Sequence, residues 1–317
     1  MPETKGNSAF RRFIISVVIW ILLSLCPQDK DSLTLRLDSL FARASRWEVG
    51  TDADTARAAR DTLIKLRDTT LDYIFAYKMN TAESIELRAM EIIFKGLAIE
   101  ARPRLMATLA HENDTVRSNA FYLIGQIKDT MFADTVASLL KTEKKPGVKR
   151  RAIHTLGELG LARSAGVIKP YLRDTSERMR FASVVALGKI KADPEIIADM
   201  LSDRSVLVRE AAETGLETSN SLGILLDRLG KSSGRERINY LRAIGLATRK
   251  SKPSDDESAL ARRAIFPLLD SPLANERAWA VWVLSPIANA GTKTKFALMT
   301  QTETDPFVLW CLEEALK

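Results

Sequence analysis

Cysteine and histidine are scarce in this chain of 317 residues, which has only two of each. Cys26 and Cys311 are too few to build a disulfide framework or a cysteine-rich metal site. His111 and His154 lack a cysteine partner and the H-x-x-x-H spacing of a zinc site. We therefore expect no metal and no cofactor. We expect Cys311 to be a small core residue and His111 to be solvated in a turn.

Glycine and proline are also sparse, with 15 and 11 residues. Helix formers dominate the composition, and no alternating strand pattern of useful length is present. The chain lacks the G-x-G-x-x-G, P-loop and G-x-S-x-G motifs, and no pair of acidic residues is set apart for acid–base chemistry. These absences predict an all-α protein that is not an enzyme.

Long apolar runs are missing as well. The longest, Phe13–Leu25, is interrupted only by two serines and reaches about 20 Å as a helix, short of the roughly 30 Å bilayer core. It follows Arg11 and Arg12, and a basic start before a short apolar run is the layout of a secretory signal. We predict that residues 1–26 are a signal peptide or membrane anchor. A buried N-terminal helix fits poorly, because a run apolar on every side needs burial on every side.

The processing site leaves alternatives open. The sequence Leu23-Ser24-Leu25-Cys26 resembles a bacterial lipoprotein box, which makes Cys26 a candidate for lipidation. Leu25 departs from that pattern, in which Gly, Ala or Ser is usual. A signal-peptidase cut after Cys26 would place Pro27 next to the cut, which is unfavourable. Lipidation, ordinary cleavage and a retained anchor all predict an exported or membrane-anchored bacterial protein, in the periplasm or on an outer membrane surface. A cytoplasmic protein is the alternative.

A stretch of thirteen residues, Val116–Lys128, recurs along the chain. Copies aligned on their second residue form one column: Arg57, Arg88, Arg117, Lys149, Arg180, Arg209, Arg237, Arg277 and Val308. Their spacing lies between 28 and 32 except for one gap of 40, where the polar insertion Lys250–Ser258 is expected to form a surface loop. A period near 30 predicts an α-solenoid over residues 51–317. Residues 27–50 are predicted to be a linker and N-terminal capping helix, with Leu33, Leu37, Leu40 and Phe41 on one face.

Small residues recur at fixed places in these helices. Glycine stands eight places after the column at Gly96, Gly125, Gly157, Gly188 and Gly245, and a small residue stands three places after it at Ala120, Ala152, Ser183, Ala212 and Ala280. We expect both columns to let neighbouring helices approach closely. A second, shorter set of helices lies between the long ones. Asp193-Pro194 and Asp305-Pro306 are typical starts of a helix.

The repeats resemble the short, roughly 30-residue HEAT repeats related to phycobilisome-lyase repeats. The residues that carry the resemblance are V-R-x-x-A-x-x-x-I-G at Val116–Gly125, V-K-x-x-A-x-x-x-L-G at Val148–Gly157 and M-R-x-x-S-x-x-x-L-G at Met179–Gly188. The resemblance implies stacked antiparallel helix pairs, about eight or nine in a right-handed superhelix, with the longer helices on the concave side. It also implies binding and scaffolding as the usual role. The lyase activity does not carry over, because many non-enzymes share this repeat.

A residue that recurs in every repeat belongs to the stacking of the repeats. We therefore predict that the arginine column pairs with an aspartate or a helix end of an adjacent unit, with Asp114, Asp174 and Asp203 as candidate partners.

Positive charge is concentrated in one segment. Residues 141–191 hold 13 Lys and Arg against four acids, whereas the whole chain has a net charge of +7. The candidate binding residues there are Lys149, Arg150, Arg151 and His154. They predict an acidic protein partner or an anionic membrane surface; nucleic acid would apply only to a chain that stays in the cytoplasm. The simpler alternative is a solvated run of charge.

Three of the five tryptophans lie near the C-terminus. Trp279 and Trp282 are neighbours on one helix face, and Trp310 occupies the place of Trp279 in the next repeat. They are either an aromatic binding site for a protein or glycan, or the cap that closes the end of the solenoid.

These observations predict a non-enzymatic scaffold of the cell envelope that binds a protein partner on the concave face. An accessory subunit of a membrane-associated assembly is one alternative. A HEAT-like lyase or DNA-glycosylase is the alternative from another class, and it would require an acid or nucleophile set off from the repeat columns.

Overall fold

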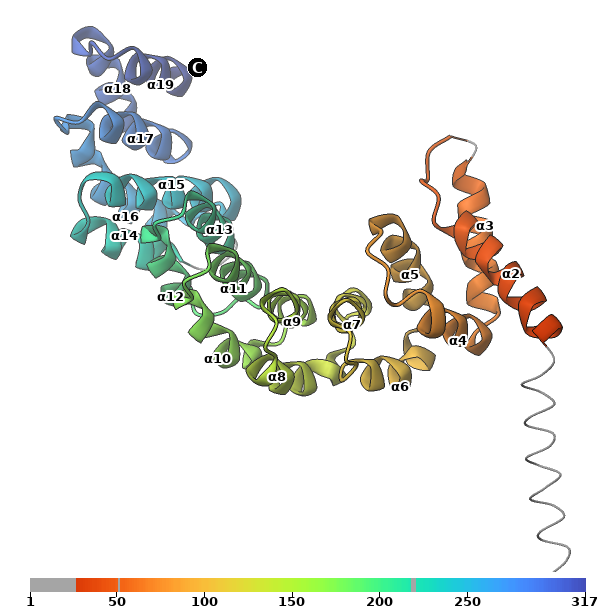
Figure 1. Cartoon of the computed structure of the whole chain (residues 1–317). Helices are drawn as coiled ribbons and strands as arrows, with labels where there is room; N and C mark the ends of the chain where they lie inside the picture. The colour runs from red at the N-terminus through yellow and green to blue at the C-terminus, as the bar shows by residue number, and fades with distance from the viewer. Residues whose placement is uncertain (1–26, 51, 218–220) are drawn as a thin grey trace, which may run out of the picture. The chain divides into compact units, whose positions relative to one another are not determined.

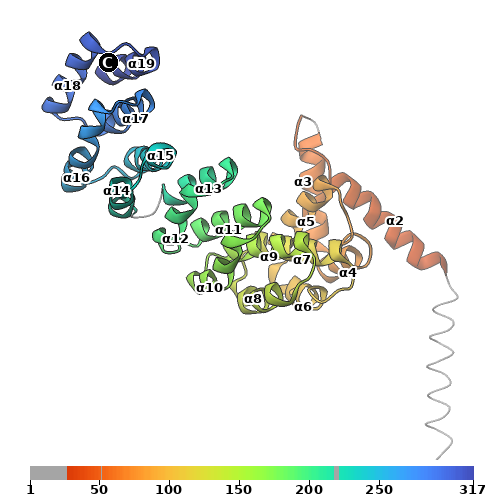
Figure 2. The ribbon, with the colours of Figure 1, turned by 60° about the vertical axis from the view of Figure 1, so that its left-hand side comes forward.

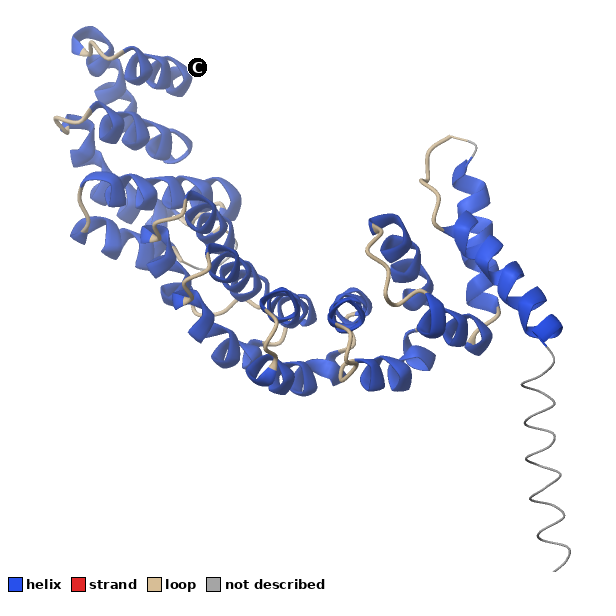
Figure 3. Cartoon of the chain, viewed as in Figure 1, coloured by secondary structure: helices blue, strands red, loops and turns tan. Residues whose placement is uncertain are grey.

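A computed structural model describes residues 27–50, 52–217 and 221–317. These residues form α-helices, short 3-10 turns and loops, and no strand occurs among them (Figure 3). The predicted all-α solenoid is therefore confirmed. None of the described helices has the length and apolar character needed to cross a membrane. The predicted signal segment, with Cys26, lies outside the described residues.

The chain divides into two compact units, with the boundary between Leu123 and Ile124 inside one helix. The first unit contains α2 (Pro27–Ala44), α3 (Asp52–Lys65), α4 (Asp68–Tyr77), α5 (Ser84–Gly96), α6 (Ala98–Thr108) and most of α7 (Asp114–Ile127). Its core includes Phe41, Leu63, Ile74 and Phe94, all almost fully buried.

The capping helix of the first unit differs from the prediction in two ways. It begins at Pro27, inside the segment predicted as linker, and it ends at Ala44. Leu37 and Phe41 are buried as predicted, but Leu33 is 47% exposed. The expected apolar face is therefore shorter than its leucine pattern, because no described neighbour covers the turn that carries Leu33.

The second unit alternates long and short helical segments. The long helices are α9 (Pro146–Leu159), α11 (Glu177–Lys189), α13 (Val206–Leu216), α15 (Gly234–Ser251), α17 (Ala274–Leu284) and α19 (Pro306–Leu316). The other set, called the short set because most of its members are short although α18 is longer than α13, α17 and α19, comprises α8 (Ala133–Thr142), α10 (Ala165–Ile168), α12 (Pro194–Ala198), α14 (Leu222–Lys231), α16 (Asp255–Ile265) and α18 (Ala290–Thr302). Each long helix packs on the next long helix, and within this unit they line one face while the short set lines the other (Figures 1 and 2).

Two short segments finish as 3-10 turns that contain proline, which lacks the backbone N–H that an α-helix needs. Pro170 lies in the turn Lys169–Arg173, and Pro267 lies in the turn Phe266–Asp270. The caps predicted from sequence are present: Asp193 accepts a hydrogen bond from the Glu195 backbone N–H, and Asp305 accepts from those of Phe307 and Val308.

The predicted small-residue columns lie at the closest contacts between long helices. A Cβ added to Gly157 would lie 2.8 Å from the Ala186 Cα, and one added to Gly188 would lie 3.0 Å from the Gly215 Cα. Ala152 and Ser183, from the second column, are completely buried. The periodicity therefore marks where backbones touch, as predicted.

The prediction of a surface loop at Lys250–Ser258 is largely wrong. Helix α15 continues to Ser251, and α16 begins at Asp255 behind a capping box in which Ser254 and Glu257 satisfy each other's backbone N–H groups. Only a short link therefore separates the helices. The gap of 40 residues between Arg237 and Arg277 instead contains most of α15, a helix of 18 residues, and α16, which begins soon after it at Asp255.

Candidate functional site

The arginine column holds the repeats together, as Arg180 shows most fully. Its guanidinium binds the Asp203 carboxylate through two nitrogens, at 2.7 and 3.0 Å, and donates to the backbone carbonyls of Asp174 and Thr175. The Arg180 and Asp203 side chains are only 6% and 7% exposed. One arginine thus ties the start of its own helix to the following repeat, which confirms the structural interpretation of the column.

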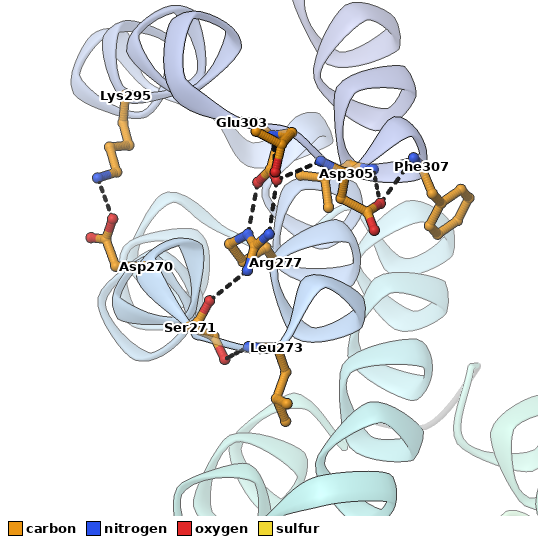
Figure 4. Close-up of polar contacts among 10 residues, drawn as sticks. Asp270, Ser271, Leu273, Arg277, Lys295, Glu303, Asp305 and Phe307 are labelled. Atoms are coloured by element: carbon orange, nitrogen blue, oxygen red, sulfur yellow. Dashed lines mark hydrogen bonds and ion pairs between the residues drawn. The ribbon is translucent and has the colours of Figure 1, made fainter.

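The same arrangement recurs around Arg277 (Figure 4). Arg277 binds Glu303 through two nitrogens, at 2.7 and 2.8 Å, and donates to the Ser271 carbonyl. The Arg277 hydrogen bonds, followed by the N–H groups of Asp305 and Thr304, outweigh burial and lower the pKa of Glu303 to about 2. Arg117 binds Asp114, one of the predicted partners, at 2.8 Å, but Asp114 lies three residues earlier on the same helix and not in an adjacent unit.

The column is misassigned in the first repeat. Arg57 is exposed, and its only acidic partner among the described residues is Asp54 on its own helix. The buried Arg60, one turn later, donates to the Ala44 and Arg46 carbonyls and pairs with Glu48. Alignment by period alone could not show which arginine faces the neighbouring helix.

The predicted basic residues on α9 have different surroundings. Lys149 lies over the Tyr171 ring, 5.8 Å from its centroid. Arg150, Arg151 and His154 are half-buried on the helix. Burial, followed by the charges of Arg151, Lys189 and Arg150, lowers the pKa of His154, and Glu158 opposes that shift. The structure therefore gathers three cations around His154, and one of them, Lys189, comes from the next long helix.

A groove of about 580 Å³ adjoins this cationic cluster, which we define as Arg150, Arg151 and Lys189. The groove lies between α11 and α13 and is lined by Phe181, Val185, Gly188, Lys189, Lys191, Leu207, Glu210, Ala211, Thr214, Gly215, Glu217 and Lys250. Its apolar walls include Phe181, 36% exposed, and Leu207, 54% exposed. Sequence reasoning did not find this groove, although Phe181 and Leu207 are visible as apolar residues outside the buried columns.

The charged rim of the groove is uneven. Lys189 pairs with Glu158, and Lys250 pairs with Glu217. Among the described residues, neither Arg150 nor Lys191 has an acidic partner. Glu210 is exposed on the α13 side. Of these two cations, Lys191 lines the groove just after the end of α11, whereas Arg150 lies on α9 outside the groove lining.

The predicted tryptophan cluster separates into two parts. The Trp279 and Trp282 rings meet edge to face, 5.2 Å between centroids, and the Arg249 guanidinium lies 3.6 Å from the Trp282 centroid. A Cβ added to Gly245 would lie 2.0 Å from the Trp282 ring, so this glycine makes the room for it. Trp310 instead stacks with Phe307 at 5.9 Å and is 54% exposed. The first pair packs the interface between long helices, and Trp310 belongs to a surface pair.

One acidic residue departs from the repeat columns and was missed. Glu213 occupies the place of the buried Ile153, Val184 and Leu241 in other repeats, and it is only 3% exposed. One carboxylate oxygen accepts from Arg242 at 3.1 Å, and the other has no hydrogen-bond partner within the part of the chain that the structure describes. Burial raises the pKa of Glu213, which Arg242 partly opposes. Comparison of the columns position by position could have revealed it.

Two other predictions concern single residues. Cys311 is buried, as predicted, and burial raises the pKa of its thiol. His111 is exposed in its turn, where Nδ1 accepts a hydrogen bond from the Asn113 backbone N–H. Within the described ranges, no group of three or more His, Cys, Asp and Glu side chains could hold a metal ion.

Comparison with known proteins agrees with this architecture. Residues 102–168 and 146–217 match the family described as HEAT repeats, so this part of the chain is similar to that family. A search of curated proteins finds no match. Importin beta is similar in structure, with a TM-score of 0.57 and 12% identity over 98% of this chain and 49% of that chain. At this identity the likeness shows the α-solenoid fold alone, and this chain spans about half of the importin beta chain.

Two further solved structures are similar at lower scores. An engineered protein has a TM-score of 0.43 and 15% identity, covering 92% of this chain and 96% of its own. The YibA protein of Escherichia coli has a TM-score of 0.48 and 17% identity, covering 86% of this chain and 98% of its own.

Proposed function

We propose that this protein is a non-enzymatic scaffold that binds a protein partner on the long-helix face of its second unit. The observation that carries the proposal is the groove between α11 and α13. Phe181 and Leu207 come from two successive long helices and stay exposed on the walls of a cavity of ligand-binding size, although exposed apolar residues also occur elsewhere on the long helices, as at Val206 and Trp310. Exposed apolar surface with a polar rim is typical of interaction sites.

The buried Glu213 gives no support to the lyase and glycosylase alternative. Such an enzyme needs an acid or nucleophile that reaches its substrate. Glu213 is the acid with the most unusual surroundings, but it is buried. Glu213 contacts Arg242 of α15 and does not line the groove.

Photo-crosslinking from the groove tests the binding face. A photoreactive amino acid at position 207 is expected to give protein adducts in cells that make this chain. The matched control places it at position 260, since Leu260 is 60% exposed on α16 of the short-helix face. Adducts that form equally from both positions, or only from 260, would contradict the proposal.

We further propose that the scaffold acts in the bacterial cell envelope, either alone or as an accessory subunit of a membrane-associated assembly. Support comes from the basic start and short apolar run of residues 1–26. Mass spectrometry of the mature N-terminus separates the outcomes: a lipid-modified Cys26, a cut near residue 26, or a retained Met1 in a membrane fraction. A retained Met1 in the soluble fraction would refute envelope location while leaving the binding face untouched.

A further inference from the structure

We infer that the groove between α11 and α13 takes a bulky apolar side chain of a partner protein segment whose acidic residues lie over the cationic cluster of α9 and α11. The inference rests on the proposed function and names the chemistry of the partner that this face selects. It follows from three features of the groove: its floor, its walls and the placement of charge along its rim.

The floor of the groove is built from small residues. Gly188 and Gly215 meet backbone to backbone, and Ala211 lies beside them. Because these residues carry at most a methyl group, the volume of about 580 Å³ above them is left open rather than filled by the protein's own side chains. A large apolar side chain therefore has space to enter between the two helices.

The walls supply the apolar contact that such an anchor needs. Phe181 projects from α11 and Leu207 from α13, and both are exposed in the free chain. An inserted aromatic or leucine side chain would remove apolar surface of its own and of these two residues from water. Full burial of one such side chain corresponds to about a tenfold to hundredfold gain in affinity.

The charge on the rim gives the segment a direction. Lys189 connects the two sites, because it lines the groove and also belongs to the three cations around His154. Arg150 and Lys191 add positive charge without acidic partners among the described residues. On the opposite wall, Glu210 is exposed and disfavours a further acid. Acidic residues of the partner therefore belong on the α9 side of the apolar anchor and not on the α13 side.

The recessed shape favours a protein segment over the other anionic occupants. A bilayer surface or a polyanion such as nucleic acid would engage the cationic cluster but would leave the apolar groove empty. Glu158, Glu210 and Glu217 also border the site and would repel a densely charged polyanion. Only a segment that combines an apolar anchor with a few acids matches both halves of the site.

Selection from a peptide library tests the inference and does not require the natural partner to be identified. The full chain is immobilised and challenged with phage-displayed random dodecapeptides. We expect the selected sequences to share one aromatic or leucine residue with two or more acids on one side of it. The affinity of a selected peptide is then measured by fluorescence anisotropy at 50 and 500 mM salt, and we expect weaker binding at the higher salt.

Two pairs of substitutions separate the anchor from the charges. Phe181→Ser with Leu207→Ser should weaken binding at least tenfold at both salt concentrations. Arg150→Glu with Lys189→Glu should weaken binding about tenfold at 50 mM salt and remove most of the salt dependence. Leu260→Ser and Lys293→Glu, exposed on the short-helix face, are matched controls that should bind like the wild type. If the first pair unfolds, Leu207→Ser alone replaces it, because Leu207 is the more exposed of the two.

Other outcomes would overturn the inference. The inference is contradicted if the selected peptides share a consensus that lacks acids or is basic. It is also contradicted if the wild-type chain enriches no peptide beyond those recovered in a parallel selection on the Phe181→Ser/Leu207→Ser chain. Cosedimentation with phosphatidylglycerol vesicles that requires Arg150 and Lys189 but is unaffected by the groove substitutions contradicts it as well. If adducts still form from position 207 in any of these cases, the proposed scaffold function stands and only the partner chemistry is wrong. If the adducts from position 207 are also lost, both the proposed scaffold function and the inferred partner chemistry are wrong.

Discussion

Replacement of Arg180 by methionine tests whether the arginine column stabilises the stack. Methionine keeps an unbranched chain of similar length but removes the guanidinium. The Asp203 carboxylate would then lie buried without its counter-ion, and the Asp174 carbonyl would lose its Arg180 hydrogen bond. Breaking a buried ion pair by removal of one partner costs about 3–5 kcal/mol of unfolding free energy. This is a large part of the stability of a typical domain.

The matched control is the same substitution in the same sequence column. Arg57→Met removes an exposed pair, since the Arg57 and Asp54 side chains are 65% and 92% exposed. We expect its effect to stay below about 0.5 kcal/mol. Urea unfolding followed by circular dichroism measures both variants. Because repeat arrays open locally, hydrogen exchange at α11 and α13 shows whether the loss is confined to the two helices that Arg180 joins.

The pH dependence of the Arg180 variant provides a second check. Burial raises the pKa of Asp203, but the hydrogen bonds from Arg180 and the Ser205 N–H outweigh it and lower that pKa overall. The wild-type pair therefore contributes stability above the ordinary aspartate pKa, and that contribution is lost as the pH falls. We expect the deficit of Arg180→Met to be greatest at neutral pH and to shrink in acid. Equal losses for Arg180→Met and Arg57→Met would refute the stacking role, as would failure of the added Asp203→Leu change to recover stability.

Three further predictions concern other contacts. Gly157→Ala should destabilise the chain by about 1–3 kcal/mol, because its Cβ would lie 2.8 Å from the backbone of Ala186. Gly166→Ala, which has open space around it, should be neutral or stabilising. Thermal melts that rank the two variants the other way would contradict the close approach at Gly157. Glu303→Gln should lower the unfolding free energy by about 2 kcal/mol at pH 7 and should match the wild type near pH 2. The reason is that a carboxyl whose pKa is lowered to about 2 loses its stabilising contribution between about pH 4.5 and 2. Acid-unfolding curves that run parallel for the two proteins would refute this. Glu213→Leu should raise the unfolding free energy by about 1–2 kcal/mol at pH 7. The gain should vanish in acid, because burial raises the pKa of the wild-type carboxyl, which then takes up a proton. A loss of stability at pH 7 would show that the bond to Arg242 outweighs the cost of the buried charge.

The repeat pattern alone was enough to predict the solenoid. A column of arginines near every thirtieth residue and a glycine eight places later can recur only if each repeat meets its neighbours in the same way. Gly157 and Gly188 lie at the closest backbone contacts, and Arg180 and Arg277 hold the following repeat, for that reason. Local signals also predicted the helix starts at Asp193 and Asp305, because a cap depends on residues that are adjacent in the chain.

Which residues face solvent, a cavity or a neighbouring helix depended on the packing of the helices. Arg57 and Arg60 differ by one helical turn, and the packing of α2 on α3 selects Arg60 for burial. Trp282 became part of the helix interface because Gly245 leaves room for its ring, whereas Trp310 stayed on the surface beside Phe307. The groove between α11 and α13 was invisible in the sequence, since its walls come from two repeats whose distance is set by two glycines in contact. A repeat pattern reports what successive units share, and a binding surface arises from side chains that only the stacked helices bring together.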